Sequence, residues 1–340
     1  MKNFTKVLLS VVVGVVFFSG CAQKVRIKAL KPAEVGEMAL KKKVAVSDFK
    51  NDKIGLSGKI ESALAHHKLE KKKYFTVLSR KDIAKVIAEQ NLQSSELMDR
   101  ETSVKVGKLI GVQAIINGEV SSADAESDFY IKAREICLRY NKEGECTRYK
   151  HYRVRCDTIQ ANVSANITIV DVETGSIIYG DIISKNYSDD SCKSYRHILS
   201  KAQALNWLAD RVAKDFIYKI TPNYIYFTVT LLDKLDVENA TAQQEKKFEN
   251  ALKYIKASRY DRAGRLLSSL MDDFEAKSYV VAYDYGIVQE ATGNYEEAEK
   301  LYNLADELTV EPVEEINVAI NRIRTLIEQE KEVKKQMNAK

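Results

Sequence analysis

The sequence predicts an α+β protein in which a layered α/β sandwich domain with a mixed sheet precedes an all-α domain of helical repeats. Three observations lead to this fold class. Between residues 42 and 233, apolar segments of period two alternate with segments of helical period. After Asp233, helix-forming residues predominate and β-branched residues become scarce. In this second part, two Tyr and Ala pairs recur 35 residues apart, as expected of a repeated pair of helices.

A short apolar stretch stands close to the start of the chain. It covers 12 residues, from Val7 to Phe18, whereas a helix that spans a bilayer needs about 20. Two lysines precede it and small residues follow it, which is typical of a secretory signal. The stretch ends in Ser19-Gly20-Cys21, which resembles the bacterial lipobox, although Phe18 replaces the usual Leu, Val or Ile.

The resemblance to a lipobox implies that residues 1–20 are a signal peptide and that Cys21 carries acyl chains. Several chains hold a protein firmly, since each buried methylene contributes roughly 0.8 kcal/mol. Ala22 comes next, where an Asp would resemble an inner-membrane retention signal. We therefore expect a lipid anchor in the outer membrane, on its periplasmic face, followed by a linker over residues 21–41. The alternative is an ordinary signal peptide or an uncleaved anchor.

The composition bounds the class of protein. With 45% hydrophobic and 30% charged residues, the chain is globular rather than disordered. No later segment reaches 18 continuous apolar residues, so no second membrane-spanning helix is expected. The net charge of +5 includes two lysines of the signal, and about +3 on the rest does not indicate nucleic-acid binding.

Four cysteines remain after Cys21, namely Cys137, Cys146, Cys156 and Cys192. An even number in an oxidising compartment predicts two disulfides, and three connectivities are possible. A metal site is the competing interpretation. It is disfavoured because no C-x-x-C spacing occurs and the histidines, apart from an adjacent pair, are scattered. We expect no metal.

The first half of the α/β domain alternates strands and helices. The expected elements are a strand in 42–49, a helix in 56–69, a strand in 74–80, a helix in 81–92, a short helix ending at Gly111 and a buried strand in 112–120. Ser57 is the expected N-cap of the first helix, and Ser79 with Asp82 resembles a capping box for the second.

The second half contains the clearest strand pair of the sequence. Residues 161–169 alternate apolar with polar side chains, and Glu173-Thr174-Gly175 supplies the turn to the next strand. A helix in 198–216 carries the only tryptophan, Trp207, and is expected to cover the sheet. One more strand follows Pro222, and the domain is expected to end at residue 233.

A cysteine-containing hairpin insertion is expected at about residues 126–160. Its stretch "RYKHYRVR" interleaves tyrosines with four cations, Arg148, Lys150, Arg153 and Arg155. In the periplasm such a stretch favours phosphates of lipopolysaccharide or an acidic protein as ligands. The alternative is a solvated hairpin stapled by disulfides, with no ligand.

Residues 234–340 form the expected helical domain. The segments "ASRYDRAGRLL" and "ATGNYEEAEKLY" align, and their Tyr followed by Ala resembles the tetratricopeptide repeat. A helix from Pro312 to about Lys334 is expected to cap the repeats. The residues predicted to contact a protein partner are Tyr260, Ala263, Tyr283, Tyr285, Tyr295, Ala298 and Tyr302.

Four segments together resemble the CsgG-like curli-secretion lipoprotein family over roughly residues 42–222. They are "KKVAVSDFKND", "YFTVLSRKDIAKVIAEQNL", "GKLIGVQAIINGEV" and "ITIVDVETGSIIYGDI", in that order. The resemblance implies a ring of protomers, each giving two membrane hairpins to an outer-membrane barrel, and a loop after the first strand that narrows the pore. Here that loop is only "KNDKIG", and "CTRYKHYRVRC" places cations on both strand faces, each costing about 2–4 kcal/mol at the bilayer midplane. We therefore do not expect a pore.

The sequence predicts no enzyme and no cofactor. It contains no phosphate-binding glycine loop, no G-x-S-x-G elbow and no H-E-x-x-H motif. The leading prediction is a non-enzymatic adaptor or assembly factor for secretion, surface structures or the cell envelope, which binds protein partners through its helical repeats. Further copies of the same chain, in a homo-oligomer, are among the candidate partners. The alternative is a ring-forming secretion channel. Activator lipoproteins of penicillin-binding proteins have a similar α/β domain.

Overall fold

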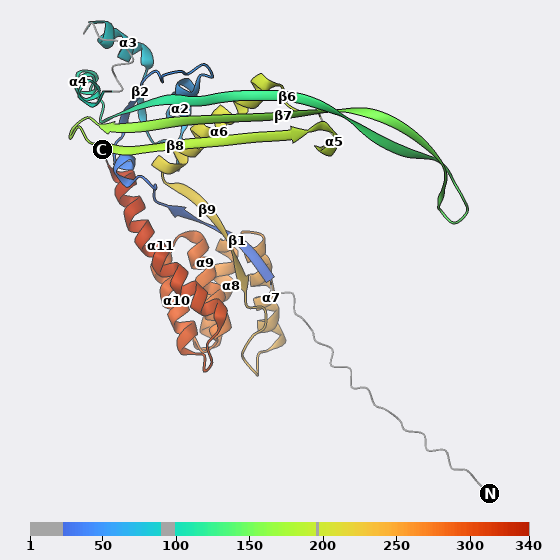
Figure 1. Cartoon of the computed structure of the whole chain (residues 1–340). Coiled ribbons are helices and arrows are strands. Elements are labelled where there is room, and N and C mark those ends of the chain that lie inside the picture. The colour runs from blue at the N-terminus through green and yellow to red at the C-terminus, as the bar shows by residue number, and fades with distance from the viewer. Residues whose placement is uncertain (1–22, 90–98, 195–196, 340) are drawn as a thin grey trace. The chain divides into compact units, whose positions relative to one another are not determined.

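The computed structural model describes residues 23–89, 99–194 and 197–339 (Figure 1). These residues form two compact units that are not contiguous in the sequence. The α/β unit contains residues 30–225 and 328–339, and the helical unit contains residues 23–29 and 226–327. The predicted α+β class, a mixed sheet with helices followed by a run of helices, is confirmed.

A five-stranded mixed sheet with the order β5-β2-β6-β7-β8 is the centre of the α/β unit. β2 runs parallel to both β5 and β6, whereas β6, β7 and β8 form an antiparallel meander. The strands are β2 (Lys43–Val46), β5 (Thr76–Leu78), β6 (Ala114–Tyr140), β7 (Cys146–Asp171) and β8 (Ile177–Asp190). The alternation of apolar residues predicted for β7 places Val163, Ala165 and Ile167 in the core.

Helices cover both faces of this sheet. On one face, α2 and α6 bury side chains such as Leu64, Leu208 and Phe216 against the strands. On the other face, α3 and α4 pack Ile83 and Val106 in a smaller core. The helices of this unit are α1 (Gly36–Leu40), α2 (Leu56–His66), α3 (Arg80–Glu89), α4 (Arg100–Ile110), α5 (Ser191–Ser194) and α6 (Lys201–Ile220).

Four further strands lie outside this sheet. β3 (Lys68–Leu69) and β4 (Lys72–Lys73) form a small antiparallel pair. β1 (Gln23–Lys31) and β9 (Asn223–Leu231) form a separate two-stranded sheet. β1 lies in the segment 21–41, which the sequence predicts to be a linker. The segment is ordered there as a strand whose alternate residues, such as Val25 and Ile27, are buried.

The helical unit is built from pairs of antiparallel helices. Its elements are α7 (Ala242–Lys256), α8 (Tyr260–Asp273), α9 (Tyr279–Thr292), α10 (Tyr295–Glu307) and the first part of α11 (Glu314–Asn338). Gly286 allows α9 and α10 to approach closely, because a Cβ there would lie 2.5 Å from the ring of Tyr302. Gly293 ends α9 at a φ of 86°, a conformation that favours glycine.

Candidate interaction surfaces

β6 and β7 form a hairpin far longer than the sheet that contains it. Their ladder runs from Ala114 and Asp171 to Tyr140 and Cys146, whereas β8 ends beside Thr158. Residues 129–157 therefore form a two-stranded ribbon without a third strand, and we call this ribbon the arm (Figure 1). Residues 126–160, where the sequence predicts a cysteine-containing hairpin insertion, are continuous with two strands of the core sheet, and their ladder has register shifts near the tip.

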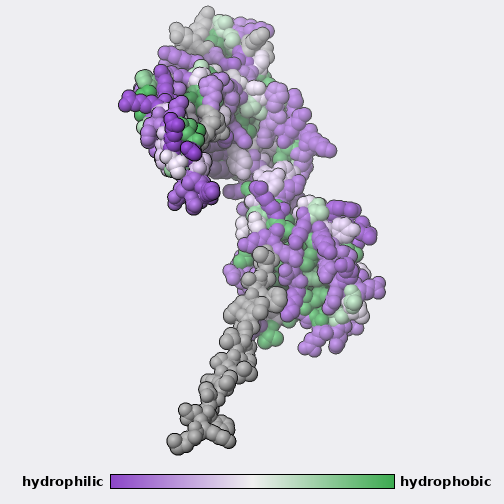
Figure 2. Space-filling view, turned by 90° about the vertical axis from the view of Figure 1, so that its right-hand side faces the viewer, coloured by the Kyte–Doolittle hydropathy of each residue, from purple (hydrophilic) through white to green (hydrophobic). Residues whose placement is uncertain are grey.

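Both faces of the arm are exposed to solvent, including large apolar side chains. Tyr140 is 64% exposed and Leu138 is 53% exposed, and the other exposed members are Phe129, Tyr130, Ile131, Ile136, Tyr149 and Tyr152. A two-stranded hairpin is marginally stable alone in water, so the arm needs additional fastening. Figure 2 is viewed from the side toward which the arm points in Figure 1, and on this face hydrophobic residues lie scattered among more numerous hydrophilic ones.

Two disulfides fasten the arm. Cys137 is bonded to Cys146 near the tip, and Cys156 is bonded to Cys192 of α5 at the base. The expected disulfides therefore form, with one of the three possible connectivities. At the base, the hydroxyl of Tyr130 also donates a hydrogen bond to a carboxylate oxygen of Asp190 at 2.9 Å.

The four predicted cations of the arm are all exposed. Arg155 is already engaged, because its Nε lies 2.8 Å from an Asp157 oxygen and its guanidinium lies 4.0 Å from the Phe129 ring centre. Arg148, Lys150 and Arg153 have no ion-pair partner among the residues that the structure describes. These three side chains are therefore available to an anionic ligand.

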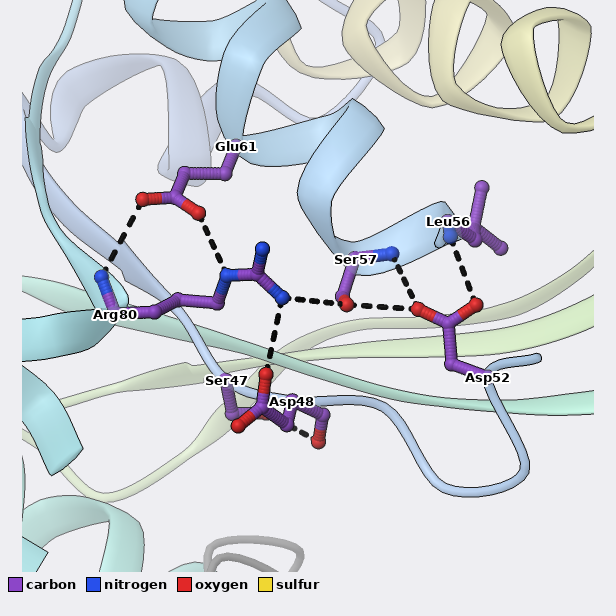
Figure 3. Close-up of polar contacts among 7 residues, drawn as sticks. All are labelled: Ser47, Asp48, Asp52, Leu56, Ser57, Glu61 and Arg80. Carbon is purple, nitrogen blue, oxygen red and sulfur yellow. Dashed lines mark hydrogen bonds and ion pairs between the residues drawn. The ribbon is translucent and has the colours of Figure 1, made fainter. Parts of the chain in front are cut away.

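The loop after β2 is short and is held against the α/β unit (Figure 3). Asp52 accepts hydrogen bonds from the backbone N–H groups of Leu56 and Ser57, at 2.7 and 2.8 Å. The N-cap of α2 is Gly55, so the prediction that Ser57 occupies this position is wrong. Ser57 lies in the first turn of the helix, where its backbone N–H donates to the Asp52 carboxylate. Asp52 can cap the helix because the loop places its carboxylate beside the first N–H groups of α2.

Arg80 joins this loop to two helices (Figure 3). Its Nε lies 2.7 Å from a Glu61 oxygen, and its Nη1 lies 3.0 Å from an Asp48 oxygen and donates to the Ser57 hydroxyl. Phe49 is buried in the same loop, where its ring covers Gly118. The loop is therefore a folded connection whose one aromatic residue belongs to the core.

The seven residues predicted to contact a partner are mostly inside the helical unit. Ala263, Tyr283, Tyr295, Ala298 and Tyr302 are buried, and only Tyr260 and Tyr285 are partly exposed. The five buried residues therefore hold the helices together and cannot form a partner surface. The Tyr and Ala pattern arises because a large side chain on one helix packs against a small one on the next.

A cleft of about 690 Å³ does open on the helical unit. It is lined by residues 230–238, by Tyr279 and Val280 of α9 and by Glu315 of α11. Leucines and valines form its apolar part, and its charged residues are four acids, Asp233, Asp236, Glu238 and Glu315, with one cation, Lys234. We call this feature the helical cleft. Sequence periodicity did not indicate it, because most of its lining comes from an irregular segment.

The wall of the helical cleft is fixed by two carboxylates. Asp236 accepts hydrogen bonds from the Tyr279 N–H, at 2.9 Å, and from the Ser278 hydroxyl. Asp284 of α9 is fully buried and accepts one from the Leu232 N–H at 3.2 Å. Burial raises the pKa of the Asp284 carboxyl well above its usual range. Glu238 and Glu315 make no ion pair within the described residues, and they give the cleft its negative charge.

The described residues bear on two further features, metal ligands and membrane-spanning helices. One group of possible metal ligands occurs there, Cys156, Asp190 and Cys192, but both of its sulfurs are in a disulfide. Cys21, the predicted lipidation site, lies outside the described residues. No helix in the described ranges is both long and apolar enough to cross a membrane.

Residues 28–254 match the family model described as curli production assembly/transport component CsgG. The match covers more than half of the chain, and the chain therefore belongs to the CsgG family. The resemblance seen in four sequence segments is confirmed. No curated protein matches the chain.

Several solved structures are similar to parts of this chain. The C-terminal domain of LpoB from Salmonella enterica is 13% identical, with 45% of this chain and 95% of that chain covered and a TM-score of 0.27. The lipoprotein GNA1162 from Neisseria meningitidis is 15% identical, with coverages of 52% and 98% and a TM-score of 0.30. The PelC dodecamer from Paraburkholderia phytofirmans is 11% identical, with coverages of 58% and 98% and a TM-score of 0.25. These likenesses are remote.

Proposed function

We propose that this CsgG-family chain is a lipoprotein of the cell envelope that serves as a non-enzymatic adaptor in assembly or transport. Acyl chains on Cys21 anchor it to the outer membrane, on the periplasmic face. The observation that carries the binding role is the helical cleft, whose leucines and unpaired carboxylates suit an apolar segment that also carries cations. The family match supports the setting in assembly or transport.

The binding surface in this proposal differs from the one expected from the repeats. Tyr295 and Ala298 are buried, so replacing either by Asp would disturb the helical fold rather than a surface. Glu238 and Glu315 line the helical cleft, and Glu238 is exposed on an irregular segment. Charge reversal at these two positions changes the proposed site with little effect on packing.

The first test is photo-crosslinking in cells. A photoreactive amino acid at Leu235 in the helical cleft should give a discrete crosslinked product, and Glu238→Lys with Glu315→Lys should remove it. The same probe at Val310, which is fully exposed outside the cleft, is the matched control and should not give that product. Equal crosslinking by the reversed variant would overturn the proposed cleft.

The anchor is tested by fractionation. Cys21→Ser should move the protein from the outer-membrane fraction to the soluble periplasmic fraction, because the acylated thiol is lost. A protein that stays with the outer membrane after this substitution would contradict anchoring through Cys21.

A ring-forming secretion channel is the second candidate. The family name includes transport, and the arm projects from the α/β unit. Against it, the arm carries exposed cations on both faces. Purified protein in liposomes should give no ion conductance if the adaptor role holds, and reproducible conductance would favour the channel.

A further inference from the structure

The tip of the arm holds two like charges at paired positions of its two strands. Arg139 of β6 lies directly opposite Arg148 of β7 in the ladder. Like charges at opposite positions destabilise a strand pair. Neither guanidinium has an ion-pair partner within the described part of the chain. An anionic surface placed at the tip would relieve this repulsion.

The same tip exposes apolar side chains. The strand register shifts between Cys137 and Arg139, so Leu138 protrudes at a bulge, and Tyr140 and Tyr149 stand close by. Each of these three apolar side chains is more than half exposed. Contiguous exposed apolar groups mark interaction sites, so the tip requires a surface that is both apolar and acidic.

The helical cleft has these complementary properties. Leu232 and Leu235 supply apolar lining, while Glu238 and Glu315 supply carboxylates without cation partners among the described residues. A protruding tip and a concave cleft are also complementary in shape. The arm belongs to the α/β unit and the cleft to the helical unit, so every copy of the chain carries both halves of this interaction.

We infer that the arm tip of one copy docks in the helical cleft of a second copy. This inference rests on the proposed function in so far as the cleft is the binding site, and it names a second copy as the occupant. Because the two surfaces differ, the contact is heterologous and builds a ring or a filament. Lys234 in the cleft offers a cation to Glu143 or Glu145 of the arm turn, whereas an anionic lipid surface offers none.

The experiment uses the full disulfide-bonded protein in mild detergent, with self-association followed by sedimentation velocity. The arm variant is Arg139→Glu with Arg148→Glu, and the cleft variant is Glu238→Lys with Glu315→Lys. Each should raise the dissociation constant for self-association by about 100-fold, because attraction becomes repulsion. Lys72→Glu with Lys73→Glu, on exposed β4, matches the charge change of the arm variant and should have no effect.

Mixing the two variants is the decisive measurement. The arm variant carries acids on both surfaces and the cleft variant carries cations on both, so neither associates alone. Together, each arm meets a cleft of opposite charge, and an equimolar mixture should associate again. Raising the salt from about 0.1 M to about 1 M should weaken both wild-type and mixed assemblies, since the Debye length falls from about 10 Å to about 3 Å.

Four results would overturn the inference. The first is a wild-type protein that remains monomeric, and the second is a mixture that does not associate. The third is arm-to-cleft crosslinking confined to single chains when light and heavy isotope-labelled copies are mixed. The fourth is a monomer that binds anionic vesicles through Arg139 and Arg148. If the arm variant self-associates as the wild type does, while Glu238 and Glu315 still control crosslinking in cells, the proposed function stands. The partner that occupies the helical cleft is then another protein.

Discussion

The buried environment of Asp284 favours the protonated, neutral form of its carboxyl group. Asp284 is fully buried, one carboxylate oxygen accepts a hydrogen bond from the Leu232 N–H, and the other has no hydrogen-bond partner among the described residues. Burial raises its pKa well above the usual range, and the nearby Asp233 charge acts in the same direction. The folded state therefore retains a proton that the unfolded chain releases at about pH 4.

This difference sets the sign of a pH dependence. Above about pH 4 the folded state binds more protons than the unfolded state, so the free energy of unfolding falls with rising pH, by up to about 1.4 kcal/mol per unit. The fall continues until the raised folded pKa is reached. Asp284→Asn should abolish this contribution, as measured by urea unfolding with circular dichroism between about pH 5 and 8. The control is Asp272→Asn, which changes an exposed carboxylate on α8 and should leave the slope unchanged.

A buried ion pair joins α9 to α11. The Glu290 side chain is 1% exposed and lies 2.7 Å from the Nε of Arg322, and the Tyr302 hydroxyl donates to Glu290 at 2.5 Å. Arg322→Met should cost about 3–5 kcal/mol, since it leaves a buried carboxylate without its cation. Adding Glu290→Gln to Arg322→Met should recover part of that loss in urea unfolding. A double variant as unstable as the single one would mean that packing, not charge, dominates.

Sequence patterns indicated that the helices form pairs, but not which of their residues are buried. The 35-residue spacing of Tyr260 and Tyr295 indicated helix pairs, because packing between helices requires large and small residues in register. The spacing contains no information on which side of the helix remains exposed, so it does not distinguish buried residues such as Tyr283 and Tyr302 from residues that face a partner. No sequence pattern indicates the ion pair of Glu290 with Arg322, since the two residues are 32 positions apart.

At the scale of elements, the two disulfides of the arm should differ in effect. The Cys156 and Cys192 bridge closes 36 residues and joins buried groups, whereas the Cys137 and Cys146 bridge closes 9 residues at an exposed tip. Loop-closure entropy gives about 4 kcal/mol for the first and about 3 kcal/mol for the second. The bridge between Cys156 and Cys192 should therefore raise the free energy of global unfolding. The bridge between Cys137 and Cys146 should stabilise only the arm against local opening.

Paired serine substitutions test this difference. Cys156→Ser with Cys192→Ser should lower the midpoint of thermal unfolding of the α/β unit. Cys137→Ser with Cys146→Ser should leave that midpoint nearly unchanged and should speed amide hydrogen exchange at the arm tip. Equal losses of thermal stability would show that the arm is part of the cooperative core.

The length of β6 and β7 was the least predictable feature among the elements. Residues 161–169 alternate because one face meets the core, and that alternation predicted the strand. Toward the tip, from Arg155 to Cys146, no residue of β7 is buried, so burial no longer imposes a pattern. The strands continue there because the ladder and two disulfides hold them, which is a property of paired segments and not of either segment alone.

At the scale of the whole molecule, the end of α11 belongs to the α/β unit. Gln336 is buried, and its side-chain oxygen accepts a hydrogen bond from the Ala33 N–H at 2.9 Å. Its backbone carbonyl accepts another from the Lys42 Nζ at 2.7 Å. A boundary drawn by composition assigns all of this helix to the repeats. Sequence patterns are local, whereas this contact joins residues about 300 positions apart.

Removing residues 328–340 should therefore destabilise a unit whose other residues end at 225. The buried Ala33 N–H would lose its partner, which costs about 1–3 kcal/mol, and Lys42 would lose one of its two carbonyl acceptors. Gln336→Ala should reproduce the first part of this loss. Trp207 lies on α6 of the α/β unit, so its fluorescence during urea unfolding reports on this unit. Lys335→Ala, one residue away and exposed, should leave the transition unchanged. An unchanged transition in the truncated chain would mean that the end of α11 contributes nothing to the α/β fold.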